Sequence, residues 1–151
     1  MNQKLSELLA KKRKKGEPNG GIDWDDRRNR YLDAVRDLYG QIEAALAEPI
    51  SQKTVSVQRR PKDVFETYIG TYAVEDLLLV IGDEQVRFSP RGRNIVGAEG
   101  RVDVVGECGE AALILEPDAK WAFVRDRQPK LELVPFDDST LAQVLQLVMR
   151  D

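Results

Sequence analysis

The chain has 151 residues, of which 23 are Lys or Arg, 26 are Asp or Glu, one is Cys and none is His, giving a formal net charge of −3. A chain of this length buries roughly 68–70% of its unfolded surface, which fits one soluble domain. The absence of His excludes a Ser-His-Asp triad and an imidazole metal ligand, and a single Cys excludes an intrachain disulfide or a Cys-rich zinc site. We therefore expect no metal and no cofactor.

Residues 1–21 are predicted to form a flexible basic arm. Leu5, Leu8 and Leu9 have the spacing of one face of a helical turn. Five consecutive cations follow them: Lys11, Lys12, Arg13, Lys14 and Lys15. The glycines and the proline after them disfavour a helix, so we expect a partner to be needed to order the arm. Apolar residues before basic ones are the reverse of a signal peptide, and one unpaired Cys suits a reducing compartment, so we expect a cytoplasmic protein.

The strongest predicted helix covers residues 24–47. Asp23 precedes it as an N-cap, and Pro49 is expected to close it. Its apolar stripe contains Tyr31, Val35, Leu38, Ile42 and Ala45, with Leu32, Tyr39 and Leu46 beside it. A helix of this length measures about 36 Å, which is enough to cross a whole sheet.

From residue 53 the period of the apolar residues changes to two, as at Val55 and Val57, which predicts strands as far as residue 135. Candidate strands at 66–73, 77–81, 85–89, 94–97, 101–105, 110–115, 120–125 and 130–135 are separated by short turn sequences. No helix-length segment intervenes, which favours an antiparallel meander over a parallel sheet. A helix at 139–149, capped by Asp138 or Ser139, ends the chain. The predicted fold class is α+β: a long N-terminal helix packed on a curved antiparallel sheet, with a short C-terminal helix, in one domain from residue 22 to residue 151.

Two apolar runs, at residues 77–81 and 111–115, do not alternate with polar residues. Both are far shorter than the roughly 20 residues of a membrane-spanning helix, so we expect no membrane span. In a strand with one face exposed to solvent, apolar and polar residues alternate. A continuous apolar run indicates that both faces of the strand are buried. The long helix covers one face, and the other is expected to be covered by the C-terminal helix, by curling of the sheet or by a second subunit. We therefore expect self-association as a homodimer.

Four arginines lie around one Pro-Gly turn: Arg87, Arg91, Arg93 and Arg101. If their strands are neighbours, these side chains form an anion-binding patch, because guanidinium groups bind phosphate or carboxylate through paired hydrogen bonds. The other interpretation is cross-strand ion pairing with Glu84, Glu99 and Asp103. Residues 11–15 are a second candidate site, for nucleic acid or an acidic partner, and binding there would weaken with salt.

These patterns contain no competent catalytic set, so the leading prediction is a non-enzymatic binding or adaptor module that acts through protein–protein contacts. Its expected surface is the face of the 24–47 helix, an edge of the sheet or the arm. A second prediction is anion or nucleic-acid binding through the arm and the arginines, although the net negative charge does not favour it. A third prediction is an enzyme that uses carboxylates, which would require a deep cleft.

Overall fold

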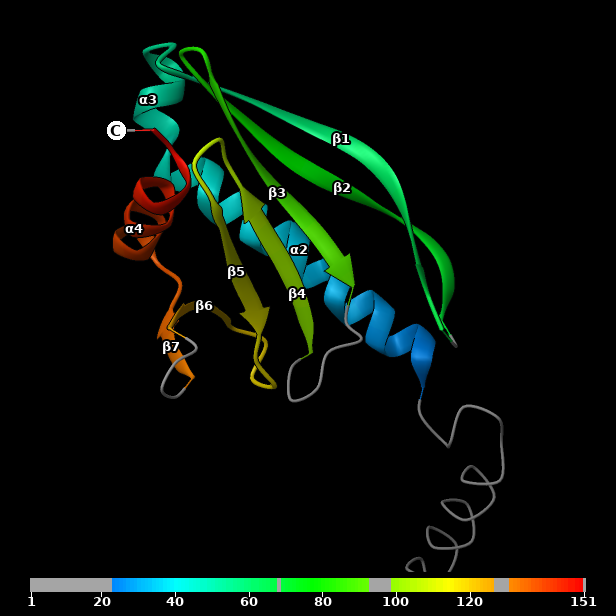
Figure 1. The fold of residues 1–151 in the computed structure, drawn as a ribbon. Helices are drawn as coiled ribbons and strands as arrows, with labels where there is room; N and C mark the ends of the chain where they lie inside the picture. Colours follow the sequence, from blue (N-terminus) through cyan, green and yellow to red (C-terminus); the bar gives the residue numbers. More distant parts are fainter. Residues whose placement is uncertain (1–22, 68, 93–98, 127–130, 151) are drawn as a thin grey trace, which may run out of the picture.

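The computed structural model describes residues 23–67, 69–92, 99–126 and 131–150 (Figure 1). In chain order the elements are α2 (Trp24–Ala45), α3 (Ala47–Ser51), β1 (Val55–Glu66), β2 (Gly70–Ile81), β3 (Glu84–Gly92), β4 (Gly100–Val105), β5 (Glu110–Leu115), β6 (Trp121–Asp126), β7 (Glu132–Pro135) and α4 (Asp138–Val148). The strands form one open antiparallel sheet in which each strand lies beside its neighbour in sequence, with β1 and β7 at the edges. This confirms the predicted α+β meander. The candidate strand at 94–97 lies outside the described residues.

Helix α2 begins where the sequence predicts it. The Asp23 carboxylate accepts a 3.0 Å hydrogen bond from the Asp26 backbone N–H, which satisfies one free donor of the first turn. The predicted end is wrong, because α2 ends at Ala45 and α3 then continues the helical path with Pro49 in its first turn. Proline is tolerated in a first turn because the N–H that it lacks would have no partner there.

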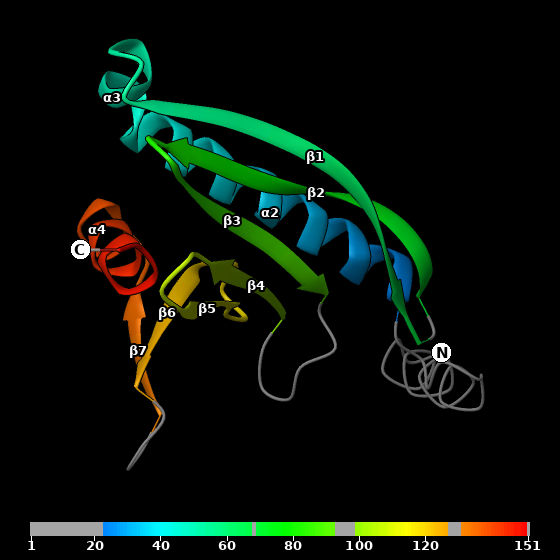
Figure 2. The ribbon, with the colours of Figure 1, turned by 45° about the horizontal axis from the view of Figure 1, so that its top comes forward.

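The sheet curls around α2, which lies along its concave side (Figures 1 and 2). Helix α4 joins the same core, which contains the fully buried side chains of Leu38 from α2, Phe88 from β3 and Val144 from α4. Burying a side chain of this size contributes roughly 1.5–3 kcal/mol. The C-terminal helix therefore shares the core of the long helix and does not cover the opposite side of the sheet.

Strands β1 and β2 form a long hairpin of two twelve-residue strands. The sequence predicts separate strands at 66–73 and 77–81, whereas β2 is continuous from Gly70 to Ile81 and β1 extends to Glu66. Pro61 lies within β1. It is tolerated because β1 is an edge strand, whose outer side needs no ladder hydrogen bond.

Strands β2 and β3 separate partway along their length, at a point that we call the fork. Strand β2 pairs with β3 only over residues 77–81, although it pairs with β1 along its whole length. The burial pattern changes phase at the same point, since Leu77 and Leu79 are buried and so are Tyr72 and Val74. Beyond the fork, the hairpin bends toward the start of α2 (Figure 2).

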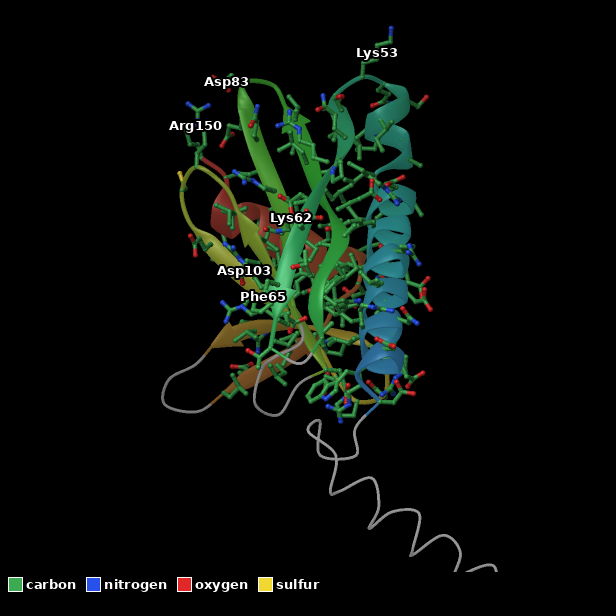
Figure 3. The ribbon with its side chains drawn as sticks, turned by 90° about the vertical axis from the view of Figure 1, so that its right-hand side faces the viewer. Lys53, Lys62, Phe65, Asp83, Asp103 and Arg150 are labelled. Atoms are coloured by element: carbon green, nitrogen blue, oxygen red, sulfur yellow. The ribbon has the colours of Figure 1, made fainter. Side chains whose placement is uncertain are left out.

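Asp137 caps α4 by accepting a 2.9 Å hydrogen bond from the Thr140 N–H, so the predicted caps, Asp138 and Ser139, are wrong by one and two residues. Past the end of α4, Arg150 pairs with Asp83 in the turn between β2 and β3 at 2.7 Å (Figure 3). Within the described residues, no helix is long and apolar enough to cross a membrane.

Candidate binding groove beside the long helix

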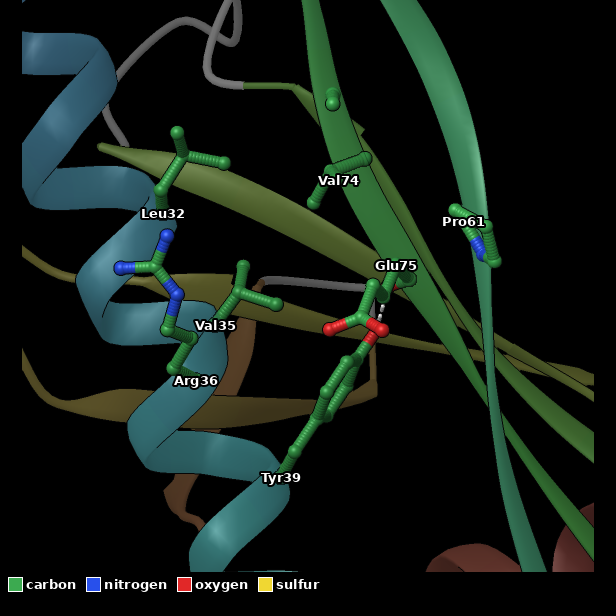
Figure 4. Close-up of a pocket in the computed structure, with 8 residues that line it drawn as sticks. Leu32, Val35, Arg36, Tyr39, Pro61, Val74 and Glu75 are labelled. Atoms are coloured by element: carbon green, nitrogen blue, oxygen red, sulfur yellow. Dashed lines mark hydrogen bonds between the residues drawn. The ribbon is translucent and has the colours of Figure 1, made fainter.

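A hollow of about 180 Å³ lies between α2 and the bent half of the hairpin, and we call it the hairpin groove (Figure 4). Most of its lining is apolar. The lining residues are Leu32, Val35, Arg36 and Tyr39 of α2, Pro61 of β1, and Ala73, Val74 and Glu75 of β2. The β2 residues all belong to the part of the strand beyond the fork, where β3 no longer pairs with it.

Tyr39 joins the two walls of the hairpin groove. Its hydroxyl donates a 2.6 Å hydrogen bond to the Glu75 carbonyl (Figure 4). The Phe88 carbonyl lies 3.2 Å from the same oxygen. Burial, and secondarily the charge of Asp76, raises the pKa of Tyr39 well above its usual range, so the hydroxyl keeps the proton that it donates. The contact connects α2 with both strands of the fork.

Arg59 of β1 supports the same end of the groove. Its guanidinium lies 5.6 Å from the centroid of the Tyr39 ring and donates hydrogen bonds of 2.7 and 2.9 Å to Glu43 of α2. Both charged side chains are about one-third exposed, and pairs of this kind contribute about 1 kcal/mol or less. The contact therefore orients the hairpin against α2 more than it stabilises the fold.

Two exposed carboxylates lie on the hairpin wall. Asp63 is the strand partner of Ala73 and Glu75 is the strand partner of Pro61, so both lie beside lining residues. Figure 4 shows the Glu75 side chain pointing toward α2. Among the described residues, neither Asp63 nor Glu75 forms an ion pair, whereas Arg36 on the opposite wall pairs with Asp33 at 2.9 Å. The hairpin wall is therefore acidic.

A buried polar pair anchors the free end of the hairpin. The Tyr72 hydroxyl donates a 2.5 Å hydrogen bond to the carboxylate of Glu66, a residue that is only 6% exposed. The same carboxylate lies against Gly92 at the end of β3, where a Cβ atom would stand 2.7 Å from the carboxyl carbon. Glycine at this position allows the end of the hairpin to approach β3.

Lys62 bridges the two strands that separate at the fork. Its ammonium donates a 2.6 Å hydrogen bond to the Ser89 hydroxyl of β3 and pairs with Asp76 of β2 at 2.8 Å. Together with the contacts at Tyr39 and Glu66, it fixes the hairpin at three places along its bent half. The groove is therefore preformed, and a preformed site loses less conformational freedom when it binds a partner.

The structure brings together two of the four predicted patch arginines. Arg91 and Arg101 both contact Asp103, at 2.9 and 2.6 Å, as in the ion-pairing interpretation of the sequence. Arg87 is exposed on β3. Arg93 and the arm residues 11–15 lie outside the described residues.

The sequence did not identify the hairpin groove, although it contained two signals for it. Pro61 interrupts an alternating segment, which is typical of an edge strand. Leu32 lies beside the main apolar stripe of α2, where a second contact surface begins. The bend of the hairpin carries no comparable signal, because it depends on contacts between residues far apart in sequence, such as Glu66 and Gly92.

The chain matches no protein-family model, and comparisons with curated proteins and with solved structures gave no significant match. Within the described ranges, no group of Cys, Asp and Glu side chains is placed to hold a metal ion. The assignment of the site therefore depends on the geometry and charge of the groove.

Proposed function

We propose that this protein is a non-enzymatic binding module that acts through protein–protein contacts, with the hairpin groove as its contact site. The size of the groove carries this proposal. Sites for small molecules occupy roughly 300–1,000 Å³, whereas a cavity of about 150 Å³ holds a benzene molecule. At about 180 Å³, the groove suits one apolar side chain, as in the anchor pockets of protein interfaces.

The charge of the groove defines the kind of segment that fits. Glu75 and Asp63 place two carboxylates on the hairpin wall, and no cation of the described residues pairs with them. A partner segment with an apolar side chain between basic residues would fill the hollow and pair with these carboxylates. Because both carboxylates are exposed, their attraction adds specificity more than affinity and weakens with salt.

Two short peptides test this proposal on the full chain. Ac-Lys-Leu-Lys-amide carries the apolar and basic groups, and Ac-Glu-Leu-Glu-amide is its matched acidic control. In a titration followed by methyl NMR, we expect the basic peptide to shift the signals of Leu32, Val35 and Val74. It should bind about threefold to tenfold more tightly than the acidic peptide at low salt, and the difference should shrink at high salt. Equal binding of the two peptides, or shifts elsewhere on the protein, would contradict the proposal.

Two pairs of variants test the hollow and the carboxylate of the groove separately. Ala73→Phe places a ring in the hollow and should abolish binding, whereas Thr71→Phe, two residues away on the same strand, should leave binding unchanged. Glu75→Gln should reduce the preference for the basic peptide, and Glu110→Gln on β5 should not. Circular dichroism and the urea midpoint confirm that each variant is folded. Unchanged binding by folded Ala73→Phe would exclude the hairpin groove as the contact site.

A further inference from the structure

We infer that the arm of this same chain, residues 5–15, occupies the hairpin groove and competes there with the partner segment. The inference rests on the proposed function, because it assigns the same groove. It adds an occupant that the chain itself supplies, so that the partner must displace the arm in order to bind.

The chemistry of the arm matches that of the groove. Leu5, Leu8 and Leu9 supply apolar side chains, and five cations follow directly at residues 11–15. The groove offers a hollow the size of one side chain next to two carboxylates, Asp63 and Glu75, that form no ion pair within the described structure. An arm with one leucine in the hollow brings its cations within reach of these carboxylates.

The length of the connecting segment permits this contact within one chain. The 14 steps along the backbone from Leu9 to Asp23 span up to about 46 Å when extended. Leu32, the first lining residue of α2, is nine residues beyond Asp23, which corresponds to about 14 Å along the helix. The arm can therefore fold back to the groove with slack. A tether of this kind gives an effective concentration near the millimolar range, which favours the arm of the same chain over that of a second copy at micromolar protein.

A second hollow on the other side of α2 fits the arm less well. It measures about 220 Å³ and includes Trp121 and Phe136 in its lining. Asp37 and Lys120 also line it, and because both are exposed and opposite in charge, they leave no net attraction for the cations of the arm. In the hairpin groove, Arg36 is paired with Asp33, and the charges of Glu75 and Asp63 are left to attract the arm. Charge therefore directs the arm to the hairpin groove.

Substitutions in the arm of the full chain test this inference. The triple variant Leu5→Ser, Leu8→Ser, Leu9→Ser removes the apolar groups, and its matched control is Gln3→Ser, Glu7→Ser, Ala10→Ser. We expect Ac-Lys-Leu-Lys-amide to bind the leucine variant about tenfold more tightly than the wild type, which corresponds to an arm that fills the groove nine-tenths of the time. The control should match the wild type.

The outcomes distinguish this inference from the proposed function. Equal, measurable affinities for the wild type and the leucine variant would overturn the arm contact and leave the proposed function intact, whereas no binding to either protein would overturn both. A spin label at Ser6→Cys, in a Cys108→Ser background, gives an independent readout. It should broaden the Val35 and Val74 methyl signals of the chain that carries it. When only that chain is observed, the broadening should persist after dilution with protein that carries no spin label. Broadening that disappears on dilution would overturn the contact within one chain.

Discussion

The hydroxyl of Tyr39 donates a 2.6 Å hydrogen bond to the backbone carbonyl of Glu75, and through it α2 sets the position of the hairpin. Because the Phe88 carbonyl lies 3.2 Å from the same hydroxyl, one buried side chain serves both strands where they separate. The width of the hairpin groove therefore depends on this tyrosine.

Tyr39→Phe should destabilise the protein by about 1–3 kcal/mol, because it leaves a buried carbonyl without its donor. It should also weaken binding of Ac-Lys-Leu-Lys-amide, since the hydrogen bond that positions the hairpin against α2 is lost. Tyr31→Phe is the control: it removes the 2.6 Å bond to the Arg101 carbonyl and the 3.1 Å bond from the Gly92 N–H, and none of these three residues lines the groove. Urea unfolding and the peptide titration should show a loss of stability in both variants and a loss of binding in Tyr39→Phe alone. Wild-type stability for Tyr39→Phe would contradict the role of the bond.

Alkaline pH should unfold the protein through Tyr31 and Tyr39. Burial raises the pKa of both phenols above the usual value, so the folded state retains two protons that the unfolded state releases. Stability from this source is complete below about pH 10, the pKa of a free tyrosine, and declines as the pH rises above it. Absorbance at the tyrosinate band should show these two phenols titrating only together with unfolding. A native protein in which both titrate near pH 10 would refute their burial.

Gly92→Ala should be more costly than Gly70→Ala. Both glycines have positive φ, 103° and 88°, so alanine is strained at either position. At Gly92 the added Cβ also meets the Glu66 carboxylate, whereas at Gly70 nothing lies within 4 Å. We expect an additional cost of about 1–3 kcal/mol at Gly92, typical of overpacking. This difference should disappear in a Glu66→Ala background, and a difference that persists would show that the strain has another source.

Asp137, which caps α4, should make the stability of the protein depend on pH in the acid range. Hydrogen bonds from the backbone and side chain of Thr140 lower the pKa of Asp137, so its contribution is present above the ordinary carboxyl pKa and is lost as the pH falls through the lowered value. Asp137→Asn keeps a capping side chain but removes the titration. Urea midpoints between about pH 5 and pH 2 should therefore fall less steeply in this variant than in the wild type or in Asp138→Asn. Parallel curves for all three would contradict the assignment.

The homodimer expected from the apolar runs at 77–81 and 111–115 stays a prediction. Leu78 is 4% exposed within a single chain, whereas Val80 and Ile114 are half-buried. A second subunit would bury the remaining exposed surface of Val80 and Ile114. Light scattering at tens of micromolar should give the mass of two chains. The mass of one chain would contradict the prediction.

Local signals in the sequence were enough to predict most of the fold. Asp23 begins α2 because a carboxylate satisfies first-turn donors, and alternation with short turns produces the meander. Two features differ from the prediction. Pro49 suggests the end of a helix, but the first turn of α3 accepts it for a local reason. The sequence also suggests two strands where β2 is one continuous bent strand, because the bend depends on contacts between distant residues.

The candidate site was less predictable than the fold. Arg91 and Arg101 are near in sequence, and the structure does bring them together, but around Asp103. The hairpin groove instead combines Leu32, Pro61 and Glu75, which are adjacent only because the hairpin bends over α2. That bend depends on buried polar contacts, such as the pair between Glu66 and Tyr72, that hydrophobic periodicity does not reveal.

The most direct test of the account is an intermolecular NOE measurement on the wild-type chain saturated with Ac-Lys-Leu-Lys-amide. If the hairpin groove is the binding site, the leucine methyl groups of the peptide should show NOEs to the methyl groups of Val35 and Val74, on opposite walls of the groove. NOEs to Trp121 and Phe136 in the second hollow, or none at saturation, would contradict it.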